Sequence, residues 1–287
     1  MRRFLKWTGI VLGTLAGLAL LAALYFLVAS QRVISRTYDV PSIAFDAPSD
    51  RDSIRKGEQL SAIYGCTSCH GADLTGSDMF DLPGIAHITA PNLTKVVKEY
   101  TDGELERVVR HGVKHDGTTT WIMPSAMFNR LSDEDLSAII AYVRSFPERP
   151  GIDRLTQIGP LGRIGVVQGK FLPQAVQVQN LPTIAHPSEA DPLARGRYLV
   201  MTSCTECHGA TLQGSDFVNA PNLSVVSAYS ESDFTRLMSK GVGAGNRTLG
   251  LMSEVAEARF SHFSDADVQA IRGYLQTFAR SGTAQLP

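Results

Sequence analysis

The chain has 287 residues, of which 44% are hydrophobic, 27 are Lys or Arg, 28 are Asp or Glu and only four are Cys. This length suggests two domains, and the balanced charge excludes a strongly basic nucleic-acid-binding protein. The normal apolar content excludes a disordered chain, and four cysteines are too few for a disulfide scaffold of this size.

An uncharged apolar stretch lies near the N-terminus. Residues 8–29 contain no charged side chain, and a helix needs about 20 residues to cross the hydrocarbon core of a bilayer. Arg2, Arg3 and Lys6 precede the stretch, which predicts that they stay in the cytoplasm and that the rest of the chain is exported. A cleaved secretory signal is the alternative, although its apolar region usually has only about 7 to 15 residues. We expect residues 1–30 to form a membrane anchor.

The remainder of the chain contains one long pattern twice. Its first segment is CTSCHGADLTGSD at 66–78, which matches CTECHGATLQGSD at 204–216, 138 positions later. Its last is FNRLSDEDLSAIIAYVRSF at 128–146, which matches FSHFSDADVQAIRGYLQTF at 260–278, 132 positions later. APNLT at 90–94 has its counterpart 130 positions later, so the second copy lacks eight residues after its first segment. A unit this long that occurs twice indicates domain duplication.

Both copies are predicted to be helical, with no persuasive strand alternation. Upstream of each CxxCH we expect a helix, at about 52–64 and 192–203. Gly57 and Gly196 lie within these segments, where a missing side chain would let the last helix of the same copy cross closely. A glycine that is merely tolerated in a helix is the alternative.

The last helix of each copy has a clear N-terminal signal. Ser132 is followed three positions later by Asp135, and Ser264 by Asp267, which predicts an N-cap and an N3 residue. Apolar residues then recur at helical spacing, so one face of each helix must pack against its domain. We therefore predict an all-α fold.

A segment rich in proline and glycine separates the copies. Residues 148–190 contain five prolines and five glycines, which is typical of a linker. Its apolar clusters suggest that it lies along the domains, because a freely mobile tether is more often polar. We place the first domain at 50–147 and the second at 191–280.

All four cysteines belong to two CxxCH motifs, and this spacing is the attachment signature of c-type haem. The two thiols bond to the two vinyl groups of the porphyrin, and the adjacent imidazole becomes the proximal ligand of the iron. The sequence therefore predicts two covalently bound haems c. The residues concerned are Cys66, Cys69 and His70 in the first motif and Cys204, Cys207 and His208 in the second.

Cysteine pairs with this spacing have three other uses in proteins besides haem attachment. A CxxC redox pair would need a thioredoxin-like βαβ context, for which the sequence has no signal. A zinc site would gather four ligands in one cluster, yet the two pairs stand 138 positions apart in separate copies. Structural disulfides are compatible with export but leave the histidine after each pair without a role.

The sixth iron ligand is sought among downstream methionines, since class I cytochromes c use a methionine there. YTDGELERVVRHGV at 100–113 matches YSESDFTRLMSKGV at 229–242, 129 positions later, and at this offset Met123 corresponds to Met252, whereas Met127 corresponds to Ala256. At the offset of 132 of the last segment, Met127 corresponds to Arg259 and Met123 to Val255. We therefore expect Met123 and Met252 to bind iron; methionines that only fill the core are the alternative. Met/His ligation leaves no open coordination position, which suits electron transfer better than substrate binding.

These motifs resemble a known family, the dihaem, membrane-anchored c-type cytochromes similar to the cytochrome subunits of bacterial alcohol, aldehyde and gluconate dehydrogenases. The resemblance covers nearly the whole chain after the anchor. The motifs that show it are, in the first copy, CTSCHGADLTG, APNLT, RHGVKHDG, IMPS and LSDEDLSAIIAYVRSFP and, in the second, CTECHGATLQG, APNLS and LMSEVAEARF. It implies two tandem class I cytochrome c domains, each with haem in a crevice between its N- and C-terminal helices.

The family pattern also implies that the carbonyls of Pro91 and Pro221 accept the ring N–H of the proximal histidines. A turn-forming Pro-Asn pair would look the same in the sequence. The chain departs from the pattern in one respect: the dehydrogenase subunits generally carry three CxxCH motifs and a membrane-binding tail, whereas this chain has two motifs and an N-terminal anchor.

The resulting expectation is a dihaem electron carrier, single-pass in the bacterial inner membrane, with most of the chain in the periplasm. It would accept electrons from a periplasmic or membrane dehydrogenase and pass them to quinone, another cytochrome or a terminal oxidase, with no nucleic acid as partner. A dihaem oxidoreductase is one alternative; a peroxidase-like enzyme needs a displaceable iron ligand, and a thiosulfate-oxidising one a fifth cysteine. A non-catalytic haem sensor or assembly subunit is the other.

Overall fold

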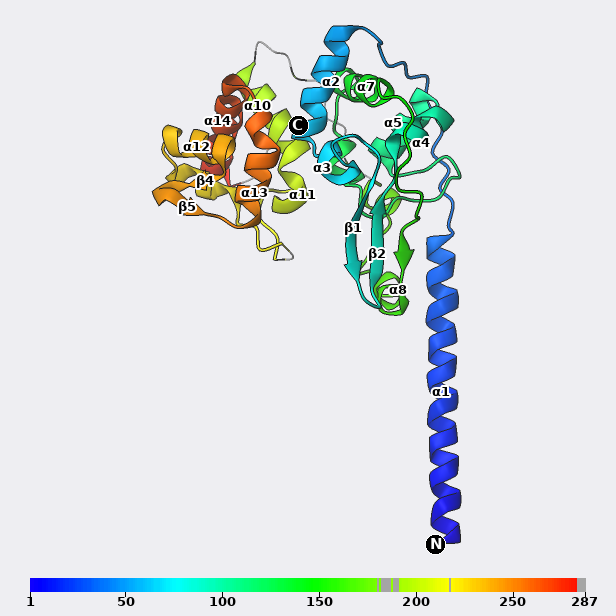
Figure 1. Cartoon of the computed structure of the whole chain (residues 1–287). Helices are drawn as coiled ribbons and strands as arrows, with labels where there is room; N and C mark the ends of the chain where they lie inside the picture. The colour runs from blue at the N-terminus through cyan, green and yellow to red at the C-terminus, as the bar shows by residue number, and fades with distance from the viewer. Residues whose placement is uncertain (180, 182–186, 188–190, 217, 283–287) are drawn as a thin grey trace.

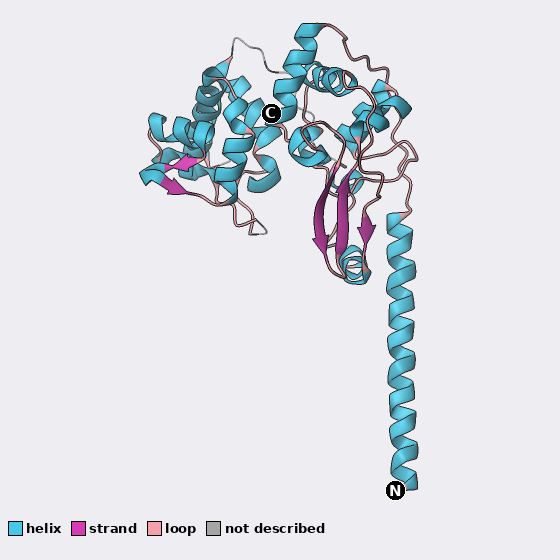
Figure 2. Cartoon of the chain, in the orientation of Figure 1, coloured by secondary structure: helices cyan, strands magenta, loops and turns pink. Residues whose placement is uncertain are grey.

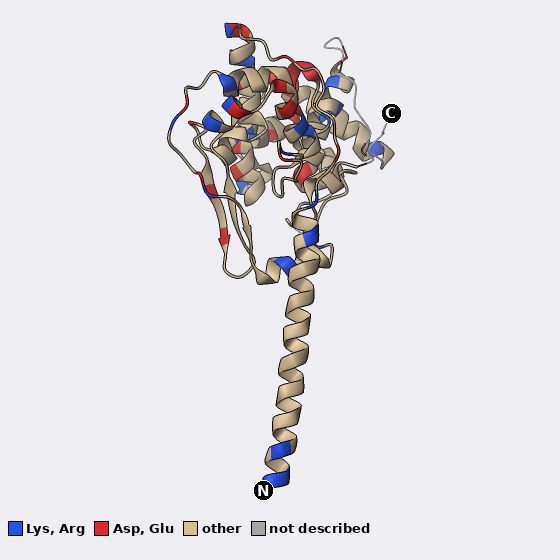
Figure 3. Cartoon of the chain, turned by 90° about the vertical axis from the view of Figure 1, so that its right-hand side faces the viewer, with Lys and Arg blue, Asp and Glu red and all other residues tan. Residues whose placement is uncertain are grey.

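A long N-terminal helix leads into two helical lobes that lie side by side in the computed structural model (Figure 1). This helix, α1 (Arg2–Ile34), is the one helix among the described residues that is long and apolar enough to cross a membrane, a test that a signal sequence would also pass. The charged residues of α1 lie at its two ends, whereas charged residues of both signs are spread over the lobes (Figure 3). The structure describes residues 1–179, 181, 187, 191–216 and 218–282.

The first lobe consists of short helices around one longer pair, α2 and α7. The predicted helix at 52–64 is confirmed to within one residue. The helices of this lobe are α2 (Arg51–Ile63), α3 (Cys66–His70), α4 (Leu93–Glu99), α5 (Asp102–His111), α6 (Ser125–Phe128) and α7 (Asp133–Arg144).

The second lobe repeats this order, and its first helix has the predicted bounds. Its main elements are α10 (Pro192–Ser203), α11 (Thr205–His208), η1 (Leu223–Ala228), α12 (Glu231–Lys240), α13 (Leu251–Ala258), η3 (Phe260–His262) and α14 (Asp265–Ser281). A minimal two-stranded ribbon follows α12, with β4 (Val242–Gly243), η2 (Ala244–Asn246) and β5 (Arg247–Thr248). The mainly helical content confirms the predicted all-α class (Figure 2).

The first and last helices of each lobe cross where a glycine removes the side chain. A Cβ on Gly57 would lie 1.9 Å from the carbonyl oxygen of Ala138 in α7. A Cβ on Gly196 would lie 1.9 Å from that of Ala270 in α14. The close crossing is therefore confirmed, and it takes place between backbones.

Both final helices begin at the predicted serines. The hydroxyl of Ser132 accepts the N–H of Asp135 at 3.1 Å, and that of Ser264 accepts the N–H of Asp267 at 3.1 Å. These caps satisfy one of the free N–H groups at each helix start and fix where α7 and α14 begin.

A β-hairpin in the first lobe was not predicted. β1 (Ser77–Leu82) pairs antiparallel with β2 (Ala86–Ala90), and β3 (Gln157–Ile158) from the linker adds a third strand (Figure 2). The expectation of no strand was therefore wrong at this place. The hairpin occupies the region where the first copy is eight residues longer than the second; the second copy has a bridge between Ser215 and Ala220 there.

The linker lies along the first lobe, as its apolar clusters predicted. The N–H of Ile152 donates to the carbonyl of Thr75 at 2.9 Å, and two short helices follow, α8 (Pro160–Val167) and α9 (Gln174–Gln177). Part of the predicted linker falls outside the described residues, namely 180, 182–186 and 188–190.

Candidate functional site

Each CxxCH motif folds as a single helical turn directly after the first helix of its lobe. Residues three apart in such a turn lie on the same side, so the two sulfurs of a motif are neighbours and the histidine follows at once. Gly65, at a φ of 76°, provides the sharp change of direction between α2 and α3. None of the four cysteines forms a disulfide.

Burial keeps the thiols protonated. It raises the pKa of Cys66 and of Cys204 to about 11, and it raises the pKa of Cys69 and Cys207 as well. A thioether sulfur carries no charge and suits such a position, whereas zinc needs the thiolate. Among the described residues, no three His, Cys, Asp or Glu side chains converge on a possible metal position. The lack of a third ligand near either cysteine pair, in the part of the chain that the structure describes, speaks against the zinc alternative.

A proline carbonyl holds the histidine of each motif. His70 Nδ1 lies 2.8 Å from the carbonyl oxygen of Pro91, and His208 Nδ1 lies 2.8 Å from that of Pro221. Burial lowers the pKa of both imidazoles, which favours the neutral ring. Each Nδ1–H then donates to the carbonyl, so the lone pair of Nε2 is left to bind iron. The structure thus brings together residues that the sequence related only through a family resemblance.

The loop after each histidine contains a residue that the sequence analysis missed. Leu74 and Leu212 have positive φ angles of 60° and 62°, and both are fully buried. The N–H of Leu93 donates to the carbonyl of Leu74 at 2.8 Å, and that of Leu223 to the carbonyl of Leu212 at 3.0 Å. These bonds tie the motif loop to the Pro-Asn turn that holds the histidine. The HGAxLxG pattern shared by both copies is the sequence signal for them.

The two candidate methionine ligands lie in different backbone settings. Met123 precedes α6 in an irregular segment, whereas Met252 is the second residue of α13. Both are partly buried against the core, while Met127 is only 2% exposed. A side chain that contacts a cofactor keeps part of its surface free of protein contacts. Met123 and Met252 meet this condition, and Met127 is a core residue.

One arginine bridges the contact between the lobes and lies near both motifs. α3 and α11 lie on the inner sides of the lobes (Figure 1). Arg259 of the second lobe donates from Nε to the carbonyl of Ile63, at the end of α2, at 2.9 Å. It also donates from Nη1 to Oε2 of Glu206, inside the second motif, at 3.2 Å. Its charge offsets part of the burial effect on the pKa of all four motif thiols, so both motifs lie near it.

The other contacts between the lobes are reciprocal. Gln59 Nε2 donates to the carbonyl of His262 at 2.8 Å. Tyr198, at the equivalent position of the second lobe, accepts the N–H of Ser132 at 3.1 Å and donates to Asp135 at 2.7 Å. Each first helix therefore lies against the segment before the last helix of the other lobe, α2 against η3 and α10 against α6. This is the contact pattern of a two-fold symmetric dimer, formed here within one chain.

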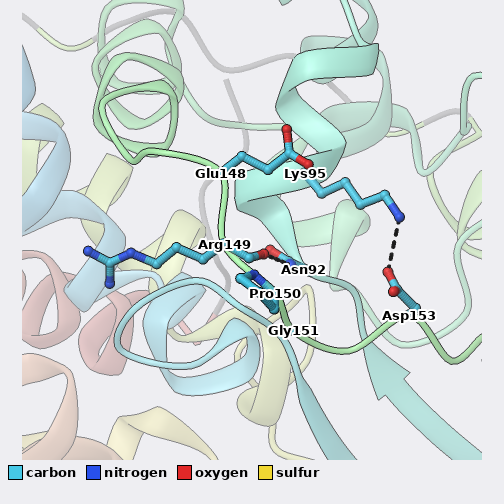
Figure 4. Close-up of a pocket in the computed structure, with 7 residues that line it drawn as sticks. All are labelled: Asn92, Lys95, Glu148, Arg149, Pro150, Gly151 and Asp153. Carbon is cyan, nitrogen blue, oxygen red and sulfur yellow. Dashed lines mark hydrogen bonds and ion pairs between the residues drawn. The ribbon is translucent and has the colours of Figure 1, made fainter.

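A surface pocket of about 320 Å³ adjoins the Pro91 turn (Figure 4). Asn92 crosses it: its Nδ2 donates to the carbonyl of Arg149 at 2.7 Å, and its Oδ1 accepts the N–H of Thr94 at 3.0 Å, which caps α4. Lys95 forms an exposed ion pair with Asp153 at 3.2 Å. The pocket therefore marks where the start of the linker is fastened to the turn that holds the proximal histidine of the first motif. Its lining is completed by Glu148, Pro150 and Gly151.

Comparison with known proteins agrees with this geometry. The fructose dehydrogenase cytochrome subunit of Gluconobacter japonicus is 29% identical over 83% of this chain and 55% of its own length. The gluconate 2-dehydrogenase cytochrome c subunit of Pantoea cypripedii is 26% identical over 87% of this chain and 64% of its own length. The cytochrome c subunit of the quinone alcohol dehydrogenase of Gluconacetobacter polyoxogenes is 27% identical, over 82% and 58% respectively. This chain thus spans between half and two thirds of these relatives, and the resemblance predicted from the motifs is confirmed.

The donor set fits covalently bound haem c. Each lobe offers two thiols on one helical turn without a disulfide, a neutral imidazole whose Nδ1 is held by a carbonyl, and a partly buried methionine downstream. The family description for cytochrome c matches residues 54–147 and 193–279, once in each lobe. The chain therefore belongs to the cytochrome c family, whose domains carry haem bound through thioethers.

Proposed function

We propose that this chain is a dihaem electron-transfer protein that is anchored in the bacterial inner membrane and exposes its two lobes to the periplasm. The observation that carries the proposal is the pair of CxxCH turns, each with an oriented histidine, on the inner sides of two lobes that contact one another. The apolar helix α1, preceded by three basic residues, supports the anchor and its orientation.

The site residues take distinct roles in this proposal. The first domain comprises 50–147 and the second 191–280, joined by the linker 148–190; the family matches in both lobes support this division. Haem attachment is assigned to Cys66, Cys69, Cys204 and Cys207, proximal ligation to His70 and His208, their orientation to Pro91 and Pro221, and sixth ligation to Met123 and Met252.

The bound haem supplies a one-electron iron couple, and the protein sets the conditions for it. The carbonyls of Pro91 and Pro221 fix each imidazole and raise its basicity as a ligand. The Met/His pair keeps substrates away from the metal, which suits outer-sphere electron transfer. Arg259 joins the end of α2 to Glu206 of the second motif, which supports a passage of electrons between the two adjacent lobes.

A dehydrogenase is the proposed electron donor, and quinone, another cytochrome or an oxidase the proposed acceptor. The support is that similar chains are named as cytochrome subunits of fructose, gluconate and alcohol dehydrogenases. Co-purification from detergent-solubilised membranes tests this assignment. We expect a dehydrogenase subunit in a fixed ratio to this chain, and addition of that enzyme's substrate should reduce both haems. Isolation of a solitary chain whose half-reduced form turns over peroxide rapidly would contradict it.

The assignment of Met123 predicts a spectroscopic change. Replacing Met123 by Ala is expected to remove the near-infrared sulfur-to-iron band of one haem, because the thioether ligand is lost. The matched control is Met127→Leu, which changes a buried methionine four positions away and should leave both bands in place. A band that persists in Met123→Ala and disappears in the control would transfer the ligand role to Met127.

A further inference from the structure

The eight-residue extension of the first copy places an apolar hairpin tip beside the C-terminal end of the membrane anchor α1. The turn between β1 and β2 spans residues 82–85, and α8 packs directly on it. The N–H of Gly159 donates to the carbonyl of Ile85 at 2.7 Å, and that of Leu161 donates to the carbonyl of Gly84 at 2.9 Å. Turn and helix therefore form one rigid unit, and Figures 1 and 3 show it beside the upper end of α1.

This unit is fastened to the anchor by hydrogen bonds. Arg163 of α8 donates from Nη1 to Ser30 Oγ at 3.1 Å and to Gln31 Oε1 at 3.2 Å. Ser30 is the buried residue of α1, whereas the apolar part of that helix has no protein cover. The uncharged stretch of α1 ends at Arg32, so the contact lies where the helix would leave the hydrocarbon core.

The side chains at the tip are apolar and face away from the protein. Leu161 is 60% exposed, Leu82 49% and Ile85 45%, and Pro83 and Pro160 between them are exposed too. No charged residue occurs in 82–86 or in 158–162. Apolar side chains bordered by arginine are the composition of protein surfaces that lie in a membrane interface. We define Leu82, Pro83, Ile85, Pro160 and Leu161 as the tip patch.

We infer that the tip patch is a second membrane contact, which enters the boundary between headgroups and acyl chains in the leaflet where α1 emerges. The inference rests on the proposed membrane anchoring of α1. Lipid is the favoured occupant because Arg163 holds the patch against the very helix that leaves the bilayer. Among the described residues, no hydrogen bond joins the second lobe to α1, and that lobe has no counterpart of the β1–β2 hairpin. With two contacts, the first lobe keeps one face toward the membrane and cannot swivel about a single helix.

Photolabelling from within the bilayer tests this contact. The full-length holoprotein is placed in phosphatidylcholine nanodiscs that contain a phospholipid with a diazirine on its acyl chain, and labelled peptides are mapped by mass spectrometry. We expect label on α1 and on the peptides that contain the tip patch, and none on peptides of the second lobe that contain Leu193 and Leu251, which are comparably exposed at 46% and 51%.

A double variant makes the test quantitative. Leu82→Asp with Leu161→Asp should lower labelling of the patch peptides about tenfold relative to α1, because charged side chains are expelled from the apolar boundary. The control, Leu193→Asp with Leu251→Asp, should leave the pattern unchanged, and the haem spectrum verifies folding of both. Label on α1 without label on the wild-type patch would overturn the inference and assign the patch to a protein partner or to water, while the anchor would stand. Absence of label from α1 would reject the anchor itself.

Discussion

Replacing Cys66 and Cys69 together by Ala is expected to reduce the haem content from two to one per chain. Both thioether bonds of the first motif are lost, and the axial ligands His70 and Met123 hold a porphyrin only reversibly. The measurement is the pyridine haemochrome absorbance per mole of protein, with intact mass as a second readout. The same double change at Cys204 and Cys207 should also leave one haem, now in the first lobe.

The control for this variant is Ser68→Ala, which alters an exposed residue inside the same turn. It should retain both haems. If the first-motif variant still carried two covalent haems, or if either double variant carried none, the assignment of one haem to each motif would be wrong.

Replacing Gly196 by Ala is expected to destabilise the second lobe by about 1–3 kcal/mol, the cost of overpacking a well-packed contact. The new Cβ would lie 1.9 Å from the carbonyl oxygen of Ala270 and 2.5 Å from its carbon, so backbone has to move. Gly57→Ala should act in the same way in the first lobe, against Ala138. Denaturant unfolding of the holoprotein, followed by far-UV circular dichroism, measures the change.

A glycine of the same lobe supplies the matched control. Gly273 lies in α14 with no atom within 4 Å of the position of a Cβ. Gly273→Ala should therefore stabilise by about 0.5–1 kcal/mol, through the better helix propensity of alanine. Equal effects at Gly196 and Gly273 would mean that the helices do not cross as closely as described.

The sequence was sufficient to predict the helices that frame each site. α10 begins and ends where periodicity and repeat placed it, and Ser132 and Ser264 cap α7 and α14, because these signals are local. The hairpin was missed because alternation of apolar and polar residues is a weak signal in strands of only five or six residues. The Pro83-Gly84 pair and the unequal copy lengths mark its location in retrospect.

Contacts between the lobes could not be predicted in the same way. Arg259 reaches Ile63 across 196 positions, and Tyr198 reaches Asp135 across 63; neither periodicity nor motif spacing reports such a pairing. The positive φ angles of Leu74 and Leu212 could not be predicted from the sequence either, because leucine rarely adopts a left-handed backbone conformation. The motifs thus predicted the chemistry of each site, whereas the relation between the sites needed the structure.

The reciprocal contact between the lobes bears on the direction of electron flow. Two identical chains joined in this way would hold two equivalent haems, and an electron would have no reason to prefer either. Here the halves share one chain and have diverged. At the offset of 132 that relates the final segments, Arg259 stands where the first half has Met127, and among the described residues the β1–β2 hairpin occurs in the first half alone. Because the halves are unequal, we expect their two haems to differ in reduction potential. An electron would then favour one of the two haems, which would give the transfer between donor and acceptor a preferred direction.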